Sequence, residues 1–276
     1  MPVTASDTDT DQQPVIVIKY GGSLMEQPVN QKDFCDDIQW LCNQGYAPVL
    51  VHGGGKALSD WMRRIGLTPV FVEGFRYTDQ QTAILCDMVL SGYTNGELVD
   101  KLNQSGVMAV GISGKDGRLL SVQKMASPSG QDLGFVGEVT HVNGDLIRAL
   151  IDQGIVPVIS SVSSDASGQT FNLNADTVAQ AVACSLFASH LVFLTDVNRL
   201  ILSGVERDMI DESELIQVCD HPDVSGGMIP KLRACRLALS CGVSQVDILN
   251  GCLSHGIRTV FDPLPMGTRF IKEKQS

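Results

Sequence analysis

Short apolar runs alternate with stretches of helical periodicity along most of the chain. The apolar runs are rich in β-branched residues, which is typical of buried strands, and they lie at 15–18, 48–52, 107–112, 156–160, 191–194 and 243–249. Between them, apolar residues three and four positions apart predict helices at 31–43, from 56, at 79–91, 95–104, 144–153, from 176 to about 187, at 211–219 and at 225–241. This alternation indicates an α/β fold with a mostly parallel sheet covered by helices on both faces.

Three smaller features interrupt this alternation. Short strands are predicted at 69–72 and 200–202, and the segments 118–124 and 135–142 read as a β-hairpin joined by a loop rich in Ser, Pro and Gly. Ligands of parallel sheets bind at the carboxyl ends of the strands, so the residues that follow the apolar runs are the candidates for chemistry.

Glycine turns follow two of the predicted strands, and a third precedes a helix. Lys19 closes the first strand and is followed by Gly21 and Gly22; the second strand leads into Gly53, Gly54 and Gly55 at the start of a helix. Uncovered backbone N–H groups beside an ammonium group, or at the amino end of a helix, favour an anion such as phosphate or carboxylate. Gly226, Gly227 and Met228 open the helix that carries Lys231 in its first turn, which repeats the arrangement.

The turn at 53–56 does not fit the two commonest phosphate-binding motifs. A Walker A loop needs glycine where Leu50 stands and Ser or Thr where Ala57 stands, and a dinucleotide-binding motif needs glycine in place of Leu58. A dinucleotide oxidoreductase is therefore excluded. A glycine turn of another kind remains.

Several polar residues at predicted strand ends and helix starts are further candidates. The guanidinium of Arg76 suits a bidentate carboxylate, although a surface ion pair would explain an isolated arginine equally well. Asn172, Asn174 and Asp176 precede or open a long helix, and capping that helix requires only one of them. Thr195 and Asp196 end the strand at 191–194.

Composition narrows the possible partners. Asp and Glu number 31 against 20 Lys and Arg, and the formal charge of −11 disfavours nucleic acid and anionic membranes as partners.

The eight cysteines are scattered singly through apolar stretches, which indicates reduced core residues and no protein-bound metal site. The five histidines show no paired arrangement, and we expect structural roles for them. The acidic segment 1–14 reads as a disordered tail without the features of a targeting signal, so we expect a cytoplasmic protein.

Seven motifs in this order resemble the amino-acid kinase family, in particular its members that phosphorylate N-acetyl-L-glutamate. The resemblance runs from Val15 to about Gly251, and it is carried by KYGGS at 19–23, VHGGG at 51–55, GFRYTD at 74–79, GFVGEV at 134–139, NLNADT at 172–177, LTDV at 194–197 and GGMIPKL at 226–232. It implies an open three-layer αβα sandwich of two lobes. The first, at 15–187, would bind the amino-acid substrate and form the dimer interface, and the second, at 188–276, would bind ATP.

The resemblance also implies roles for the candidate residues. Lys19 and Lys231 would flank the transferring phosphoryl group, and Asp176 would position both lysines. The acceptor would contact Arg76 through its α-carboxylate, and the other expected acceptor contacts are Gly53, Gly54, Gly55, Asn172 and Asn174. ATP, with Mg²⁺, would contact Gly21, Gly22, Thr195, Asp196, Gly226, Gly227 and Met228. A γ-carboxylate is already ionised at neutral pH, so the reaction needs no general base.

The chain departs from the family pattern in two places. Asn198 and Arg199 stand where the family usually has Pro-Gly, and the stretch after His255 lacks the acidic helix of members that arginine inhibits. The members that arginine inhibits also have an apolar N-terminal helix that builds a hexamer, whereas the segment 1–14 is polar. We therefore expect a homodimer without arginine feedback by that route, whereas the sequence does not decide whether a PII-type regulator binds. Two alternatives stay open: a kinase of the same fold acting on another acylated amino acid or specialised-metabolite carboxylate, and a non-catalytic metabolite-binding paralogue.

Overall fold

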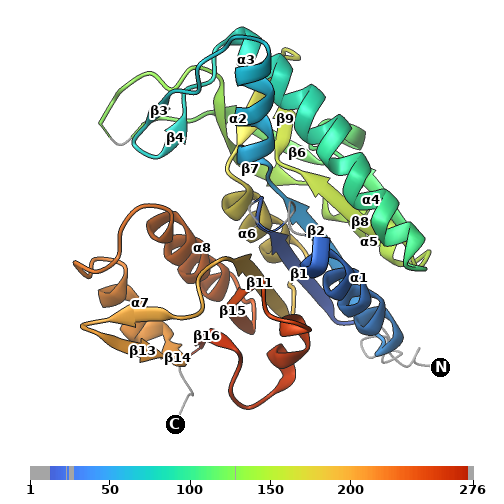
Figure 1. The fold of residues 1–276 in the computed structure, drawn as a ribbon, viewed down its shortest axis with the longest axis vertical. Helices are drawn as coiled ribbons and strands as arrows, with labels where there is room; N and C mark the ends of the chain where they lie inside the picture. Colours follow the sequence, from blue (N-terminus) through green and yellow to red (C-terminus); the bar gives the residue numbers. More distant parts are fainter. Residues whose placement is uncertain (1–12, 23, 25–27, 128, 273–276) are drawn as a thin grey trace, which may run out of the picture.

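An eight-stranded sheet forms the centre of the molecule (Figure 1). The computed structural model describes residues 13–22, 24, 28–127 and 129–272, so all but the last two residues of the predicted tail 1–14 lie outside the described residues. Neighbouring strands pair in parallel except for β15 with β16, which pair antiparallel. In spatial order the strands are β14 (Met209–Asp211), β16 (Gly267–Ile271), β15 (Gln245–Asn250), β11 (His190–Thr195), β1 (Val15–Tyr20), β2 (Ala47–His52), β8 (Val156–Ser160) and β5 (Ala109–Ile112). The predicted mostly parallel sheet is confirmed.

Alternate residues of β1 explain why the sheet is covered on both faces. Val15 and Val17 belong to one hydrophobic cluster, and Ile16 and Ile18 belong to a second cluster on the opposite face. The first cluster includes residues of α5 (Gly144–Ile151), α6 (Ala175–Ser185), α7 (Glu212–Val218) and α8 (Met228–Ser240). The second includes residues of α1 (Pro28–Asn43), α4 (Asn95–Gln104) and the 3₁₀ helix η4 (Gly256–Phe261). The result is the expected sandwich of helices, sheet and helices.

The helices predicted at 79–91 and 95–104 are joined into one. α3 (Gln80–Cys86) continues through a π-helical segment, η2 (Asp87–Thr94), directly into α4. The side chain of Asp79 accepts a hydrogen bond from the backbone of Thr82 at 2.8 Å and so caps this helix, as predicted. α2 (Gly55–Arg64) lies beside η2, and its residues form a third, small core with those of η2.

A second, four-stranded sheet lies at one end of the molecule. The predicted hairpin forms as β6 (Leu120–Lys124) and β7 (Val136–Val142), and it is extended by β10 (Thr170–Leu173) and β9 (Val162–Ser164). Strands β9 and β10 are too short to be recognised from the sequence pattern. Of the predicted strand 69–72, only β3 (Phe71–Val72) is extended, and it pairs with β4 (Phe75–Arg76) in a projecting hairpin (Figure 1).

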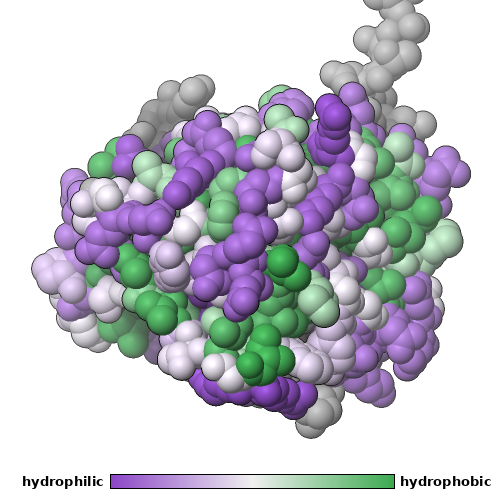
Figure 2. Space-filling model, turned by 90° about the horizontal axis from the view of Figure 1, so that it is seen from above, coloured by the Kyte–Doolittle hydropathy of each residue, from purple (hydrophilic) through white to green (hydrophobic). Residues whose placement is uncertain are grey.

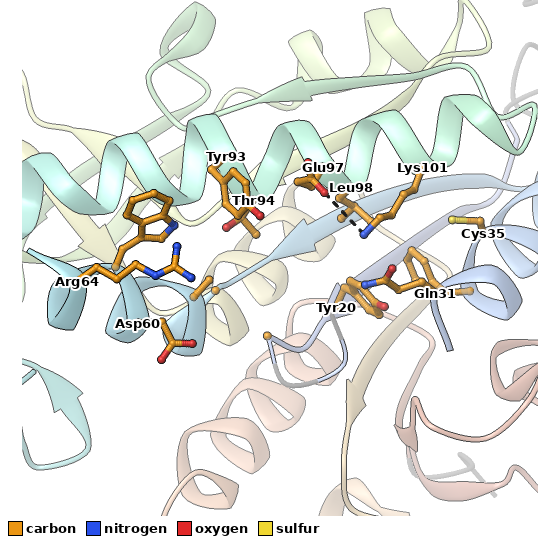
Figure 3. Close-up of a pocket in the computed structure, with 15 residues that line it drawn as sticks. Tyr20, Gln31, Cys35, Asp60, Arg64, Tyr93, Thr94, Glu97, Leu98 and Lys101 are labelled. Atoms are coloured by element: carbon orange, nitrogen blue, oxygen red, sulfur yellow. Dashed lines mark ion pairs between the residues drawn. The ribbon is translucent and has the colours of Figure 1, made fainter. Parts of the chain in front are cut away.

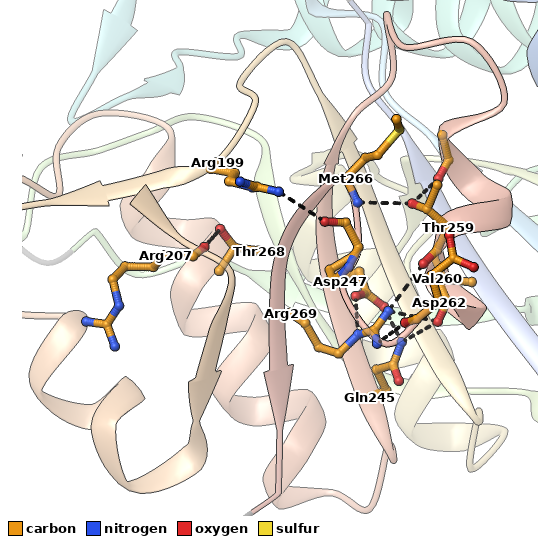
Figure 4. A network of polar contacts seen from close by, with 12 residues as sticks. Arg199, Arg207, Gln245, Asp247, Thr259, Val260, Asp262, Met266, Thr268 and Arg269 are labelled. Atoms are coloured by element: carbon orange, nitrogen blue, oxygen red, sulfur yellow. Dashed lines mark hydrogen bonds and ion pairs between the residues drawn. The ribbon is translucent and has the colours of Figure 1, made fainter. Parts of the chain in front are cut away.

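The carboxyl-terminal strand β16 was not predicted, and a buried polar network holds it (Figure 4). Arg269 lies opposite Asp247 on β15, donates from Nε to its Oδ1 at 2.8 Å, and donates from Nη2 to the carbonyl of Val260 in η4 at 2.8 Å. Burial raises the pKa of Asp247, although the paired Arg269 opposes this effect. The network fixes the segment that departs from the family pattern against the sheet.

The remaining strands form a small hairpin of β12 (Leu200–Leu202), which was predicted, and β13 (Val205–Arg207), which was not. The short 3₁₀ helix η3 (Asp116–Arg118) precedes β6. The border predicted between the lobes, at 187/188, falls between α6 and β11 within one continuous sheet, so the division of function between two lobes stays a prediction. None of the helices in the described part of the chain is long and apolar enough to cross a membrane.

Candidate active site

Two lysines from distant parts of the sequence meet at one aspartate. Lys19 lies near the carboxyl end of β1, Asp176 in the first turn of α6 and Lys231 in the first turn of α8. The Nζ of Lys19 lies 3.0 Å from Oδ1 of Asp176, and the Nζ of Lys231 lies 2.9 Å from Oδ2. The Lys231 contact is a directed hydrogen bond, whereas the Lys19 contact is an ion pair without that geometry. The structure therefore brings together the three residues on which the expected chemistry depends.

This cluster is nearly buried and carries an excess positive charge. The side chains of Lys19, Asp176 and Lys231 are 14%, 10% and 8% exposed. Burial works to raise the pKa of Asp176, but the two lysines outweigh it and hold that pKa below its ordinary value. Burial lowers the pKa of Lys19, and the ammonium of Lys231 adds to this effect. Because two ammonium groups share one carboxylate, an anion bound here would complete the charge balance.

The glycine turns after β1 and β2 pack against each other and against β11. A Cβ on Gly22 would lie 3.3 Å from Cα of Gly54, and a Cβ on Gly21 would lie 2.8 Å from the carbonyl oxygen of Leu194. Larger residues would push these backbones apart. Glycine is therefore required here by close approach, and the turn at 53–55 lines the same cavity as Lys19.

His52 holds the second glycine turn in place, a role that the sequence reasoning did not assign. Its buried ring donates from Nδ1 to the carbonyl of Gly53 at 2.7 Å and accepts at Nε2 from the amide of Asn95 at 3.0 Å. Burial lowers the pKa of His52 to about 4, so the imidazole is neutral at pH 7. The signal was its position directly before three glycines at the end of a buried strand.

Arg76 lines a cavity of about 240 Å³ that extends from the lysine cluster. The arginine is buried, and its Nη2 donates to Ser59 Oγ at 2.7 Å and to the carbonyl of Gly55 at 2.8 Å. Within the described residues, no Asp or Glu forms an ion pair with it, so the surface ion pair considered from the sequence is not what the structure contains. A buried guanidinium held only by neutral groups is a site for a carboxylate ligand.

The two asparagines occupy different positions in the same wall. Asn174 caps α6, because its Oδ1 accepts from the backbone N–H of Asp176 at 2.8 Å. The capping role is sufficient to explain why an asparagine stands here, and no ligand contact is needed for it. Asn174 also borders the cavity. Asn172 extends from β10 into the same wall, and its Nδ2 donates to Thr78 Oγ1 at 3.3 Å.

The other residues expected to contact ATP lie at the end of β11 and before α8. Thr195 ends β11 and Asp196 follows it, and the negative charge of Asp196 acts on Lys19. Gly226, at φ 56°, and Gly227 face open space before α8, whereas the side chain of Met228 packs against the core. No contact of Met228 with a nucleotide follows from this packing, and the ATP roles of all these residues stay predictions.

Phe193 is a further residue of the site that sequence reasoning missed. Its ring lies beneath Lys231, with Nζ 5.3 Å from the ring centroid. The residue looks like any other core position of a buried strand.

A larger pocket of about 440 Å³ lies beyond the glycine turns, between α1, α2 and the η2–α4 helix (Figure 3). It is bordered by Gly22 and Gly54, by the Glu97–Lys101 pair and by Arg64, whose guanidinium lies 5.0 Å from the ring centroid of Trp61. Neither lysine of the cluster lines this pocket. The smaller cavity is therefore the candidate acceptor site, because the charges converge there.

The described residues contain no group of three His, Cys, Asp or Glu side chains that could hold a metal ion. A Mg²⁺ ion that accompanies a nucleotide is usually held chiefly by phosphate oxygens and water, and it needs no such group.

Comparisons with known proteins show what the chain is similar to. The chain is 41% identical to an acetylglutamate kinase of Caldanaerobacter subterraneus subsp. tengcongensis, over 94% of this chain and 87% of that protein. It is 40% identical to an acetylglutamate kinase of Synechocystis sp., over 93% and 87%.

Among solved structures, N-acetylglutamate synthase from Neisseria gonorrhoeae, complexed with coenzyme A and N-acetyl-glutamate, superimposes with a TM-score of 0.83 at 25% identity. The match covers 94% of this chain and 60% of the synthase chain, so this chain spans about three fifths of that protein's length. The family model described as "Amino acid kinase family" matches residues 14–250. Lys19, Asp176 and Lys231, from three of the ordered motifs, meet in one cluster. With these matches, the chain belongs to the amino-acid kinase family.

Proposed function

We propose that the protein transfers the γ-phosphoryl group of ATP to the γ-carboxylate of N-acetyl-L-glutamate, forming N-acetyl-L-glutamyl 5-phosphate in arginine biosynthesis. The observation that carries the proposal is the Lys19–Asp176–Lys231 cluster, in which Lys19 and Asp176 line a cavity that Arg76 also lines. The identity of about 40% to acetylglutamate kinases over nearly the whole chain supports this choice of substrate.

The cavity suits an acceptor with two carboxylates. Its volume of about 240 Å³ is below the range of roughly 300–1,000 Å³ that is usual for drug-sized ligands, and it fits a molecule the size of an acylated amino acid. Arg76 would bind the α-carboxylate, and the N–H groups of the turn at 53–55 would face the γ-carboxylate. The amide of Asn172 would bind the remaining polar atoms.

The lysines would supply the electrostatic stabilisation that phosphoryl transfer requires. The carboxylate nucleophile is ionised at neutral pH, with an ordinary pKa of about 4.3, so the site needs no base. The barrier arises from the approach of two anions and from the negative charge on the equatorial oxygens of the transferring phosphoryl group. Lys19 and Lys231 would stabilise this charge from two sides. Asp176 touches both ammonium groups and would hold them at a fixed separation.

Mg²⁺ would further neutralise the phosphates of ATP when it is bound with the nucleotide. The chain's own contribution on that side would come from the N–H groups near Gly21, Gly22, Gly226 and Gly227 and from the polar groups of Thr195 and Asp196. Met228 would be the least direct of these contacts, since its side chain packs on the core.

A hydroxamate-trapping assay tests the substrate. Purified protein with ATP and Mg²⁺ is offered N-acetyl-L-glutamate, N-acetyl-L-aspartate, L-glutamate and larger acylated amino acids, and hydroxylamine traps any acyl phosphate that forms. We expect the highest kcat/KM with N-acetyl-L-glutamate. A higher value with another acceptor would reassign the substrate within the family, and turnover with none of them would favour a non-catalytic role.

We infer a homodimer that pairs through the outer edge of β5. This strand ends the eight-stranded sheet, and Met108 and Val110 on the β5 side are exposed apolar residues. Ile84 and Met88 are exposed on α3–η2, the first part of the long helix whose α4 segment packs against β5. Hydrophobic surface also interrupts the polar side chains on the end of the molecule seen in Figure 2. Val110→Lys should shift the mass in sedimentation equilibrium from two chains to one; a mass of six chains in the wild type would contradict the inference.

A further inference from the structure

Two cysteines lie next to each other where α6 and α8 end. Cys184 is the penultimate residue of α6, and Cys241 is the C-cap of α8. The Sγ of Cys184 lies 4.0 Å from the carbonyl oxygen of Leu237, and the backbone N–H of Cys241 donates to the same oxygen at 3.0 Å. The Cys241 thiol is near enough to contribute to the raised pKa of Cys184. The Cys184 thiol and the backbone of Cys241 therefore meet at one carbonyl oxygen, and both side chains line one hollow.

The pair is open to a small reagent. Cys241 is exposed and Cys184 is half-buried, and both line a hollow of about 700 Å³ that α5, α6 and β7 also border. Arg148 and Asp145 also line this hollow, so it offers a charged group of each sign to a zwitterionic peptide reagent.

The position of the pair links it to the lysine cluster. α6 and α8 pack against each other in one core cluster, with Asp176 and Lys231 at their amino ends and the two cysteines at their carboxyl ends. At 1.5 Å per residue, Cys184 lies about 12 Å along α6 from Asp176. A covalent bond at one end of this helix pair restrains the separation of the other end.

We propose that Cys184 and Cys241 form a reversible thiol–disulfide site that is oxidised by a low-molecular-weight disulfide of a cysteine-containing peptide. The thiolate of Cys241 attacks one sulfur of the reagent, which forms a mixed disulfide and releases one thiolate of the reagent. The thiolate of Cys184 then attacks the Sγ of Cys241, which closes the protein disulfide and releases the second thiolate. Two electrons pass to the reagent, and its two released sulfurs take up the two protons.

The order of attack follows from the surroundings of the two thiols. Burial, together with the hydrogen bond from Cys241, raises the pKa of Cys184 to about 12, so this thiol stays protonated while Cys241 reacts first. Once Cys241 is in the mixed disulfide, its thiol no longer opposes ionisation of Cys184.

Peptide mapping tests the bond itself. The full chain is incubated with oxidised or reduced glutathione, free thiols are blocked, and the digest is analysed by mass spectrometry. We expect a joined peptide pair containing Cys184 and Cys241 after oxidation, and its loss with dithiothreitol. The pair should be absent in Cys184→Ser and in Cys241→Ser and present in the control Cys219→Ser. A persistent glutathione adduct on Cys241 without the joined pair would overturn the proposal.

Two further measurements test the link to the helix pair. The oxidised wild type should unfold at a higher temperature than the reduced one, since a cross-link lowers the entropy of the unfolded chain, and Cys241→Ser should show no such difference. The oxidised form should also lose turnover that dithiothreitol restores, an expectation that rests on the proposed function. If the joined peptide forms and turnover is unchanged, the coupling to the site is wrong. If the protein phosphorylates none of the acceptors, the mapping and unfolding results still decide whether the bond forms.

Discussion

Replacing Asp176 by Asn tests the central feature of the site, because one carboxylate neutralises two buried ammonium groups. The variant keeps the size of the side chain but leaves Lys19 and Lys231, each about 3 Å from the lost charge, without a counterion. Removing one partner from a buried ion pair typically costs about 3–5 kcal/mol. We expect a loss of free energy of unfolding in this range for the protein without ligand.

The same change should alter catalysis in a way that simple destabilisation would not. Without Asp176 the site carries more positive charge, so it should bind inorganic phosphate or ATP at least as tightly as the wild type. The lysines lose the group that fixes their separation, and kcat should fall about 10²–10³-fold, the usual effect of losing one preorganised electrostatic contact. The variant would thus have a lower kcat without a higher KM for ATP, which simple destabilisation would not produce.

Urea unfolding gives the stability, and initial rates at saturating ATP give kcat. Asp60→Asn is the control, because Asp60 pairs with Arg63 at 2.7 Å on the surface, and such pairs contribute at most about 1 kcal/mol. The reasoning is refuted if Asp176→Asn changes stability no more than Asp60→Asn does, or if its kcat stays within a factor of about three of the wild type.

Three other substitutions address the parts of the site around this cluster, and a fourth, Gly96→Ala, is a control outside it. Arg76→Met should lower kcat/KM for the acceptor about 10–100-fold, which corresponds to about 1.5–3 kcal/mol for a charged hydrogen bond. KM for ATP should be unchanged. An equal change in kcat/KM for the acceptor and in KM for ATP would contradict a role of Arg76 in binding the acceptor. The pKa of His52 is lowered from 6.5 to about 4 in the folded state, so its contribution to stability is complete above pH 6.5 and is lost as the pH falls toward 4. The variant His52→Gln lacks this titrating group. As the pH falls from 6.5 to about 4, its free energy of unfolding in urea should therefore decrease by about 3 kcal/mol less than that of the wild type, and parallel curves would contradict this. Gly21→Ala should destabilise by about 1–3 kcal/mol, because the new Cβ would lie 2.8 Å from a backbone oxygen, whereas Gly96→Ala, in open space on α4, should stabilise by about 1 kcal/mol; equal effects on the unfolding midpoint would argue against close packing of the turn.

The sequence alone determined those parts of the protein that depend on local order. The run 15–18 is β-branched and flanked by turn residues, and its alternate side chains enter two cores on opposite faces of the sheet. Hydrophobic periodicity thus predicted the layers, and glycines beside Lys19 and before Lys231 predicted two anion-binding turns. Two of the strands that it missed, β9 and β14, are only three residues long, and in them pairing rather than composition decides the conformation.

Only the tertiary structure decided which of these residues work together. Lys19 and Lys231 are far apart in the chain, and their meeting at Asp176 depends on parallel strands that end at one edge and on the packing of α6 against α8. The burial of Arg76 among neutral groups likewise arises from the contact of β4 with α2. Sequence pattern reports the neighbours of a residue along the chain, whereas charge balance and desolvation depend on neighbours in space.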